Sequence, residues 1–222
     1  TGLLVVNTAE YWSLFGQIVI LILIQMGGLG FMTMATIVAL LIGKKITLKE
    51  RLIIKEQLNQ KTISGLVKLT KYVVFSTFII EGIGALLLST RFIPQYGMVK
   101  GTWFSLFHAI SAFCNSGFDI IGNNMVSFAG DFVVNITIAL LVIIGGLGFS
   151  VYIDISQNRT FKKLHLHSKL ALTITIILIL IGMILFYLIE QNNPDTLLNL
   201  TKGEKLLSAF FQSVITRTAG FN

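Results

Sequence analysis

The chain has 222 residues, of which 54% are hydrophobic and 12% are charged, and its formal net charge is +7 at pH 7. A soluble domain usually has about 25% charged residues, so the composition argues against a water-soluble fold and for a membrane protein. The single cysteine, Cys114, excludes an internal disulfide and a thiolate metal cage. The sequence contains no phosphate-binding glycine loop, zinc motif or nucleophile elbow, so we expect neither an enzyme nor a bound cofactor.

Long stretches without Asp, Glu, Lys or Arg define the predicted membrane-spanning helices. Such stretches cover residues 11–43, 132–153 and 170–189, and each is long enough for the ~20 apolar residues of a spanning helix. A further candidate, residues 72–90, is interrupted only by Glu81. The predicted fold is therefore an all-α membrane protein, with spanning helices over residues 13–42, 72–90, 132–155 and 169–189.

Basic residues gather in two loops between these helices. Eight of the seventeen Lys and Arg lie between Lys44 and Lys71, and four more lie between Arg159 and Lys169. Short basic loops separated by an even number of membrane crossings are typical of the cytoplasmic side. The basic residues of a nucleic-acid-binding face would not be expected to cluster at the ends of membrane-spanning helices. We expect a multi-pass protein of the cell membrane that is surrounded by the lipid bilayer and binds no nucleic acid.

A short apolar segment that follows an expected outer loop at residues 94–100 does not fit a simple crossing. This segment, 102–113, covers only about half of a hydrocarbon core at 1.5 Å rise per residue, and a Cys-Asn-Ser-Gly sequence follows at 114–117. The predicted helices on both sides connect to the outer face, so the segment must enter and leave by that face as a re-entrant loop. Residues 206–215, followed by 216–221, repeat the pattern of a short helix and a glycine turn.

Internal repeats indicate how the chain is organised. Residues 105–119 align without gaps on residues 208–222, which places Gly117 on Gly220. The opening Thr-Gly-Leu of the chain is similar to the tail of the same element. The repeating unit is therefore a helix, a re-entrant loop and a second helix, as in potassium channels.

A second repeated motif, Gly-Gly-Leu-Gly-Phe, occurs at residues 27–31 and 145–149. Because small residues in mid-span let helices approach closely, we interpret the motif chiefly as a packing motif, with a hinge as the alternative. We expect the sequence to be a fragment of three parts. Residues 1–67 hold the tail of the first filter, the second helix of unit one and a cytoplasmic loop. Residues 68–167 form a complete second unit, and residues 168–222 form a truncated third unit.

Repeated breaks in helices at membrane depth need a physical reason. Each unsatisfied amide there costs several kcal/mol, roughly, unless it lines water or is buried in protein. Carbonyl oxygens that line a narrow pore can replace the water around a dehydrated cation, and glycine permits the backbone angles that direct them. A short helix also directs its partly negative carbonyl end toward the pore. The pattern thus favours a cation filter over an anion pathway.

Segments around these glycines resemble the filters of a known family. Residues 115–119 (Asn-Ser-Gly-Phe-Asp), 217–222 (Arg-Thr-Ala-Gly-Phe-Asn) and 1–3 (Thr-Gly-Leu) resemble filter segments of the Trk/Ktr/HKT superfamily of potassium transporters. Residues 11–17 and 25–33 are similar to the Ktr-type membrane subunits of that superfamily. The resemblance implies four fused units around one pore, with a single glycine in each filter, of which the fourth unit lies outside this sequence.

The same resemblance implies a function and partners. It implies transmembrane uptake of K⁺, possibly dependent on Na⁺, and a homodimer in the full-length protein. It also implies a cytosolic nucleotide-binding regulatory subunit of the KtrA type. The basic stretch between Lys44 and Lys71 could dock that subunit, or it could lie on the anionic inner leaflet as an amphipathic helix.

We predict which backbone positions form the filter, and we expect no metal other than the transported K⁺. The predicted filter residues are Thr1 and Gly2 in unit one, Asn115, Ser116 and Gly117 in unit two, and Thr218, Ala219 and Gly220 in unit three.

Ionisable residues near the predicted filters need partners. We expect Arg217 to be neutralised by Glu81 or Asp119, although Glu81 could instead lie near a wet helix end. His108 is interpreted as a packed or hydrogen-bonded residue rather than a metal ligand or proton relay. Cys114 is interpreted as a small packing residue rather than a redox switch.

Two other classes of function remain open. A secondary transporter with broken helices would bind a small solute at the midplane, but an inverted repeat would place half of the filter glycines on the inner side. An intramembrane enzyme centred on His108, Glu81 and Asp119 lacks a second convergent catalytic group.

Overall fold

The structure is a computed structural model, and it describes residues 5–30, 66–123, 125–194, 196–198 and 200–221. Over this part of the chain every regular element is helical, which confirms the predicted all-α fold. The helices are α1 (Thr8–Tyr11), α2 (Leu14–Leu29), α5 (Leu66–Tyr96), α6 (Met98–Phe113), α7 (Phe132–Leu147), α8 (Phe149–Asn158), α9 (Leu166–Glu190) and α10 (Lys202–Ile215), with 3-10 turns at Val126–Phe128 and Phe161–Lys163.

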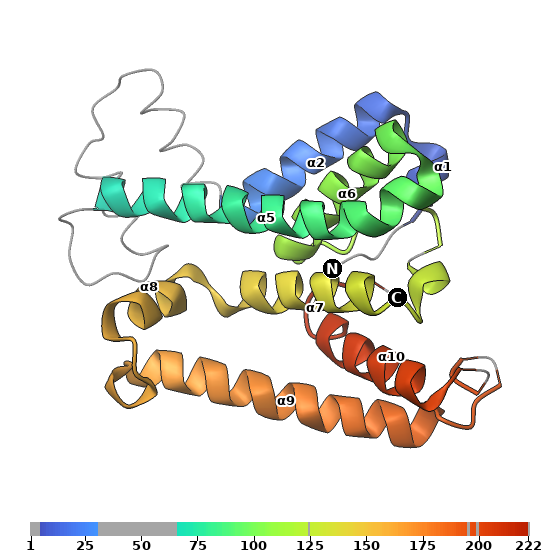
Figure 1. Cartoon of the computed structure of the whole chain (residues 1–222). Coiled ribbons are helices and arrows are strands. Elements are labelled where there is room, and N and C mark those ends of the chain that lie inside the picture. The colour runs from blue at the N-terminus through green and yellow to red at the C-terminus, as the bar shows by residue number, and fades with distance from the viewer. Residues whose placement is uncertain (1–4, 31–65, 124, 195, 199, 222) are drawn as a thin grey trace.

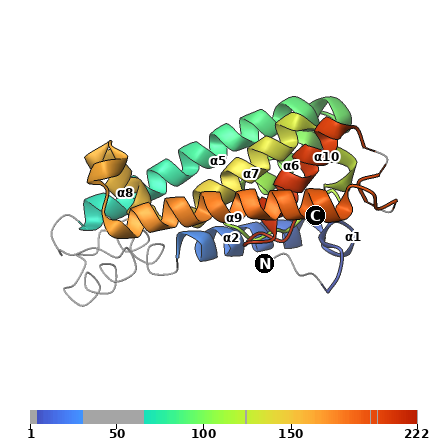
Figure 2. The ribbon, with the colours of Figure 1, turned by 90° about the horizontal axis from the view of Figure 1, so that it is seen from below.

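Helices α5 and α9 run along the length of the molecule in both ribbon views (Figures 1 and 2). Thr70–Tyr96 and Leu166–Glu190 are each long and apolar enough to cross a membrane. Helices α7 and α8 supply a further span if the bent pair is taken as one. Helix α9 exposes apolar side chains such as Ile176, Leu178 and Ile181, as expected of a surface that faces lipid. The prediction of a membrane protein is confirmed.

The predicted continuous helix over 132–155 is wrong. Helices α7 and α8 meet at 88°, and the break is at Gly148, whose φ is +83°. Only glycine adopts that backbone region without steric cost, so the chain turns sharply after Leu147. Helix α8 therefore leaves the line of α7 instead of completing a straight crossing.

The expected outer loop at 94–100 is much shorter than predicted. Helix α5 continues through Pro94 to Tyr96, and only Gly97, with φ +81°, separates it from α6. The two helices pack so closely that a Cβ on Gly101 would lie 2.6 Å from Ile93 Cα. The first helix and the short helix of unit two thus form a tight hairpin.

The predicted helix over 13–42 is described only in its first half. The Ser13 side chain caps α2 by accepting from Gly16 N, and the helix ends at Gly30, whose φ is +81°. Residues 31–42, and most of the basic stretch between Lys44 and Lys71, lie outside the described residues.

The core lies around the short helix α6, which packs between α5 and α7. Phe92 from α5, Phe113 from α6 and Ile138 from α7 are almost fully buried there. A second cluster joins α2 to the opposite side of α6 through Leu21 and Phe107. The second half of α6, from Phe107 to Phe113, is therefore enclosed by protein, which stabilises a helix that ends at membrane depth.

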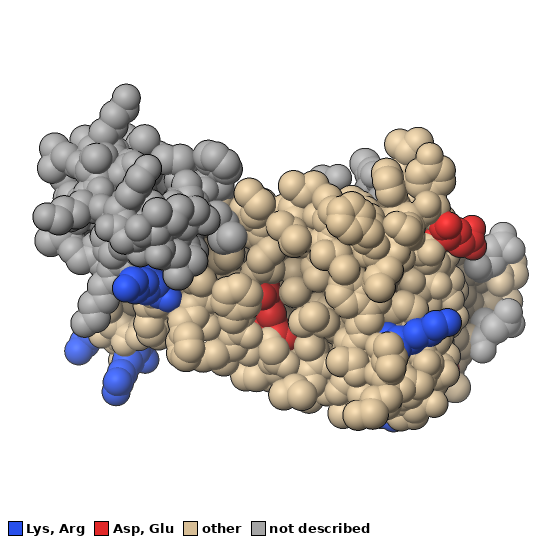
Figure 3. Space-filling model, turned by 90° about the horizontal axis from the view of Figure 1, so that it is seen from above, with Lys and Arg blue, Asp and Glu red and all other residues tan. Residues whose placement is uncertain are grey.

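Figure 3 shows Lys and Arg side chains toward the two ends of this face, and the stretch between them is uncharged apart from a small acidic patch near its middle. Such a belt matches a surface that is exposed to hydrocarbon in its middle and to polar surroundings at its ends.

Candidate ion-conducting site

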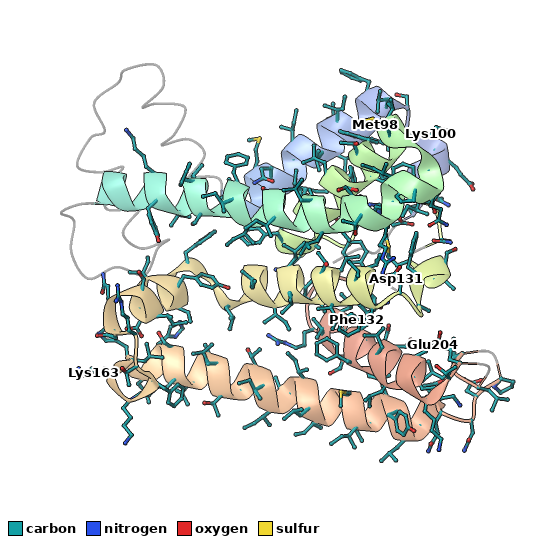
Figure 4. The ribbon with its side chains drawn as sticks, in the orientation of Figure 1. Met98, Lys100, Asp131, Phe132, Lys163 and Glu204 are labelled. Carbon is teal, nitrogen blue, oxygen red and sulfur yellow. The ribbon has the colours of Figure 1, made fainter. Side chains whose placement is uncertain are left out.

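Two short helices enter the molecule from the same end. Met98 and Lys100, at the start of α6, lie toward the same end as Asp131 and Glu204, whereas Lys163 lies at the opposite end (Figure 4). Helices α6 and α10 have 16 and 14 residues, so at 1.5 Å per residue they are about 24 and 21 Å long. Both are shorter than the ~30 Å hydrocarbon core. They are re-entrant helices of like orientation, which argues against an inverted repeat.

The second predicted filter follows α6 directly and is unwound. Asn115 and Gly117 both have positive φ, at +54° and +73°. Ser111 holds the unwound strand: its carbonyl accepts from Ser116 N at 2.9 Å, and its hydroxyl donates to Phe118 O at 2.9 Å. Because the N–H and C=O of a trans peptide point in opposite directions, the carbonyl of Asn115 is directed away from α6.

The third predicted filter has the same character. The amides of Thr218, Ala219 and Gly220 all converge on Ile215 O, at 3.1, 3.0 and 3.4 Å, and Gly220 has φ +65°. By the same peptide geometry, the carbonyls of Arg217, Thr218 and Ala219 are directed away from the end of α10. Two unwound segments therefore present carbonyl oxygens that the helices themselves do not use.

The structure brings these two segments together. Thr218 Oγ1 lies 2.8 Å from Asn115 Oδ1, although the two residues are 103 positions apart. The carbonyl ends of α6 and α10 carry partial negative charge and lead into the same region, which favours a cation between them. Thr1 and Gly2, the predicted first filter, lie outside the described residues.

The two glycine motifs pack against the end of α6. A Cβ on Gly145 would overlap the carbonyl oxygen of Phe113, and one on Gly28 would overlap the sulfur of Cys114. These glycines therefore have the predicted packing role, and Cys114 is a packing residue there. The last glycine of each motif has a different place, because Gly30 and Gly148 have positive φ and end their helices. The hinge alternative stays a prediction.

A histidine and a carboxylate secure the chain just after the second filter. His108 is fully buried, with Nδ1 2.7 Å from Phe104 O and Nε2 2.8 Å from Asp119 Oδ1. The Asp119 carboxylate also accepts from the backbone amides of Ile121 and Gly122, each at 2.8 Å. The hydrogen-bonded interpretation of His108 agrees with this geometry, but the pairing itself was missed. The sequence contained one signal for this pairing, because His108 and Asp119 flank a turn that reverses the chain.

The predicted neutralisation of Arg217 by Glu81 or Asp119 is not formed. Arg217 Nη2 lies 3.4 Å from Thr175 Oγ1, on helix α9 of its own unit. Gln25 Nε2 instead donates to both oxygens of Glu81, at 3.0 and 3.2 Å. The alternative that Glu81 lies near a wet helix end is also wrong, since the residue is only 2% exposed. Glu81 is thus bound from helix α2 and Arg217 from helix α9, and the sequence did not reveal either partner.

The comparison with known families covers the entire sequence. Residues 1–222 match the family model TrkH, described as a cation transport protein. The chain belongs to the TrkH family of cation transport proteins. The resemblance seen in the filter segments is therefore confirmed, and membership of this family identifies a membrane transport protein and not an enzyme.

Three of the curated relatives that this TrkH-family chain matches are bacterial uptake proteins. It is 50% identical over 222 residues to the Ktr system potassium uptake protein B of Bacillus subtilis. It is 44% identical over 221 residues to the potassium/sodium uptake protein NtpJ of Enterococcus hirae, and 42% over 224 residues to the Ktr system potassium uptake protein B of Vibrio alginolyticus. Each match covers 100% of this chain and 50%, 49% and 49% of the respective relative. The chain thus spans about half the length of the curated relatives it matches.

Proposed function

We propose that this chain is part of a membrane subunit that takes up K⁺ through a filter of backbone carbonyls. The observation that carries the proposal is the meeting of two unwound segments, at Asn115 and Thr218, each at the end of a short helix that enters from the same face. The filter would include the carbonyls of Thr1, Gly2, Asn115, Ser116, Gly117, Thr218, Ala219 and Gly220.

The chemistry of this site suits a monovalent cation. A dehydrated cation needs several oxygen ligands, and carbonyl oxygens supply them without a full negative charge that would retain the ion. The carbonyl ends of α6 and α10 add a favourable field for a positive ion. Transport would be downhill, driven by the membrane potential.

The relatives support K⁺ as the main ion, because Ktr system potassium uptake protein B is named for it. The name of NtpJ, a potassium/sodium uptake protein, supports a role for Na⁺ as well. We propose that the full-length protein is a homodimer and acts with a cytosolic nucleotide-binding subunit of the KtrA type. Residues 44–71 would either dock that subunit or bind the anionic inner leaflet.

Growth rescue tests the proposal. The full-length gene is expressed in a bacterial strain that lacks K⁺ uptake, and growth is followed at low K⁺ with and without added Na⁺. The proposal predicts growth at low K⁺, and faster growth with Na⁺ if Na⁺ participates. Expression in the membrane without any rescue, together with no ⁸⁶Rb⁺ influx into those cells, would reject K⁺ uptake as the function.

A further inference from the structure

We propose that the side chains of Asn115 and Thr218 form a strap that sets the spacing between filters two and three, and that this strap contributes to selectivity for K⁺ over Na⁺. The inference deepens the proposed function and rests on it. It concerns side chains, whereas the proposed ion ligands are backbone carbonyls.

Asn115 and Thr218 occupy equivalent positions in two repeated units. The gapless alignment places Gly117 on Gly220, an interval of 103 residues (220 − 117), and the hydrogen bond joins residues that are also 103 apart. Asn115 and Thr218 are therefore the same position of consecutive units. A contact between equivalent positions lies on the boundary that the two units share, directly below the two filter glycines.

The Asn115 end of the strap is anchored. Asn115 Nδ2 donates to Phe113 O at 3.3 Å, on the last residue of α6. The amide group also faces α7, where a Cβ on Gly146 would lie 3.8 Å from both Asn115 Nδ2 and Oδ1. Asn tolerates the left-handed conformation found here better than most residues. The side chain is thus held between the end of the short helix and the glycine motif of the next helix.

The Thr218 end of the strap is anchored as well. Thr218 N donates to Ile215 O at 3.1 Å, on the last residue of α10. One hydroxyl therefore links the ends of both short helices through a 2.8 Å bond to Asn115 Oδ1. The hydroxyl is the donor if Asn115 Oδ1 is the acceptor, as the donation from Asn115 Nδ2 to Phe113 O requires.

The consequence concerns the positions of the ligand oxygens. Selectivity between ions of different size depends on where carbonyl oxygens stand around the ion and how freely they move. With the strap, filters two and three move together at Asn115 and Thr218, two residues before their glycines. Without it, the two segments adjust independently, and their oxygens can approach a smaller ion.

The test compares the full-length protein with Thr218→Val, which keeps the shape but removes the hydroxyl, and with the conservative Thr218→Ser, which restores it. Competition between Na⁺ and ⁸⁶Rb⁺ is measured in proteoliposomes. We expect the selectivity of Thr218→Val for Rb⁺, which stands for K⁺, over Na⁺ to fall about fivefold. A ratio of about this size corresponds to the free energy that one hydrogen bond contributes. Thr218→Ser should recover most of that loss. Asn115→Gly, which removes the side chain and tolerates the left-handed backbone, should resemble Thr218→Val, and the double variant should be no worse than either single one.

Equal selectivity of Thr218→Val and wild type would overturn the strap, and so would an equal loss in the Val and Ser variants. Failure of the strap can be told apart from failure of the proposed function by measuring the wild-type protein. If wild type takes up no ⁸⁶Rb⁺, K⁺ uptake itself is rejected. In that case, or if a variant does not transport, the melting temperatures of purified Asn115→Gly, Thr218→Val and the double variant test the strap instead. Non-additive shifts support the strap, and additive shifts overturn it.

Discussion

His108 Nε2 lies 2.8 Å from Asp119 Oδ1, and the two side chains are 0% and 3% exposed. His108 Nδ1 faces the carbonyl of Phe104 at 2.7 Å, and a carbonyl can only accept, so Nδ1 carries a proton. A second proton must lie between Nε2 and the carboxylate. The pair is therefore either a buried ion pair or a neutral histidine that accepts from a protonated acid, and in both forms it joins α6 to the backbone beyond filter two.

This proton count predicts an order for substitutions of Asp119. Asp119→Asn can still donate to a neutral His108 through its amide and accept from a backbone amide through its oxygen. Asp119→Ala leaves His108 and the amides of Ile121 and Gly122 without that partner. We expect Asp119→Ala to lose about 3 kcal/mol or more of stability, and Asp119→Asn about 1 kcal/mol. Thermal unfolding in detergent measures both, and equal losses in the two variants would refute the proton count.

The glycine packing at the end of α6 predicts an effect of a single methyl group. A Cβ on Gly145 would overlap Phe113 O, whereas nothing lies within 4 Å of a Cβ on Gly27. We expect Gly145→Ala to cost about 1–3 kcal/mol of stability through overpacking and to reduce ⁸⁶Rb⁺ uptake by displacing filter two. Gly27→Ala should be neutral or slightly stabilising, because alanine favours the helix. Similar behaviour of the two variants would contradict the packing role.

The filter assignment predicts a change of selectivity at Gly117. Its φ of +73° strains any residue with a side chain, by roughly 1–2 kcal/mol, so Gly117→Ser should shift the carbonyls and lower K⁺ over Na⁺ selectivity. Gly203→Ser is the matched control, since nothing lies within 4 Å of a Cβ on Gly203. Current reversal potentials at different K⁺ and Na⁺ gradients report the ratio. An unchanged reversal potential in Gly117→Ser counts against the assignment.

The start of α10 predicts a dependence on pH. Glu204 accepts from the backbone amide and the hydroxyl of Thr201, and these two hydrogen bonds hold the pKa of Glu204 below its ordinary value. The folded-state pKa is the lower one, so the cap's contribution is complete above the unfolded value of 4.5 and is lost as pH falls through the folded value. Melting temperatures of wild type and Glu204→Gln should therefore converge in acid. A difference that stays constant with pH would contradict the cap.

Sequence reasoning found the features that depend on composition and repetition. The charge-free stretch 170–189 revealed the span of α9 because lipid tolerates few charges, and the alignment of Gly117 on Gly220 revealed two re-entrant helices. The same repeat contained the signal for the contact of Asn115 with Thr218, since equivalent positions meet at a unit boundary.

Features that depend on tertiary packing were not predicted. The glycines of one motif look alike in sequence, yet Gly145 packs against α6 and Gly148 breaks the helix. Pro94 suggested a loop, but the proline lies exposed near the end of α5, and the helix continues past it to Tyr96. Arg217 was assigned a carboxylate on charge alone, and only its position beside α9 brings it to Thr175.

The central claim is that the unwound segments 115–117 and 218–220 share one ion path. Its most direct test is a structure of the full-length protein grown in Rb⁺ or Tl⁺, with the ion located by anomalous scattering. The account predicts density between the two segments, within coordination distance of carbonyls from both. Ordered ions elsewhere in the membrane region, with none between these segments, would contradict it.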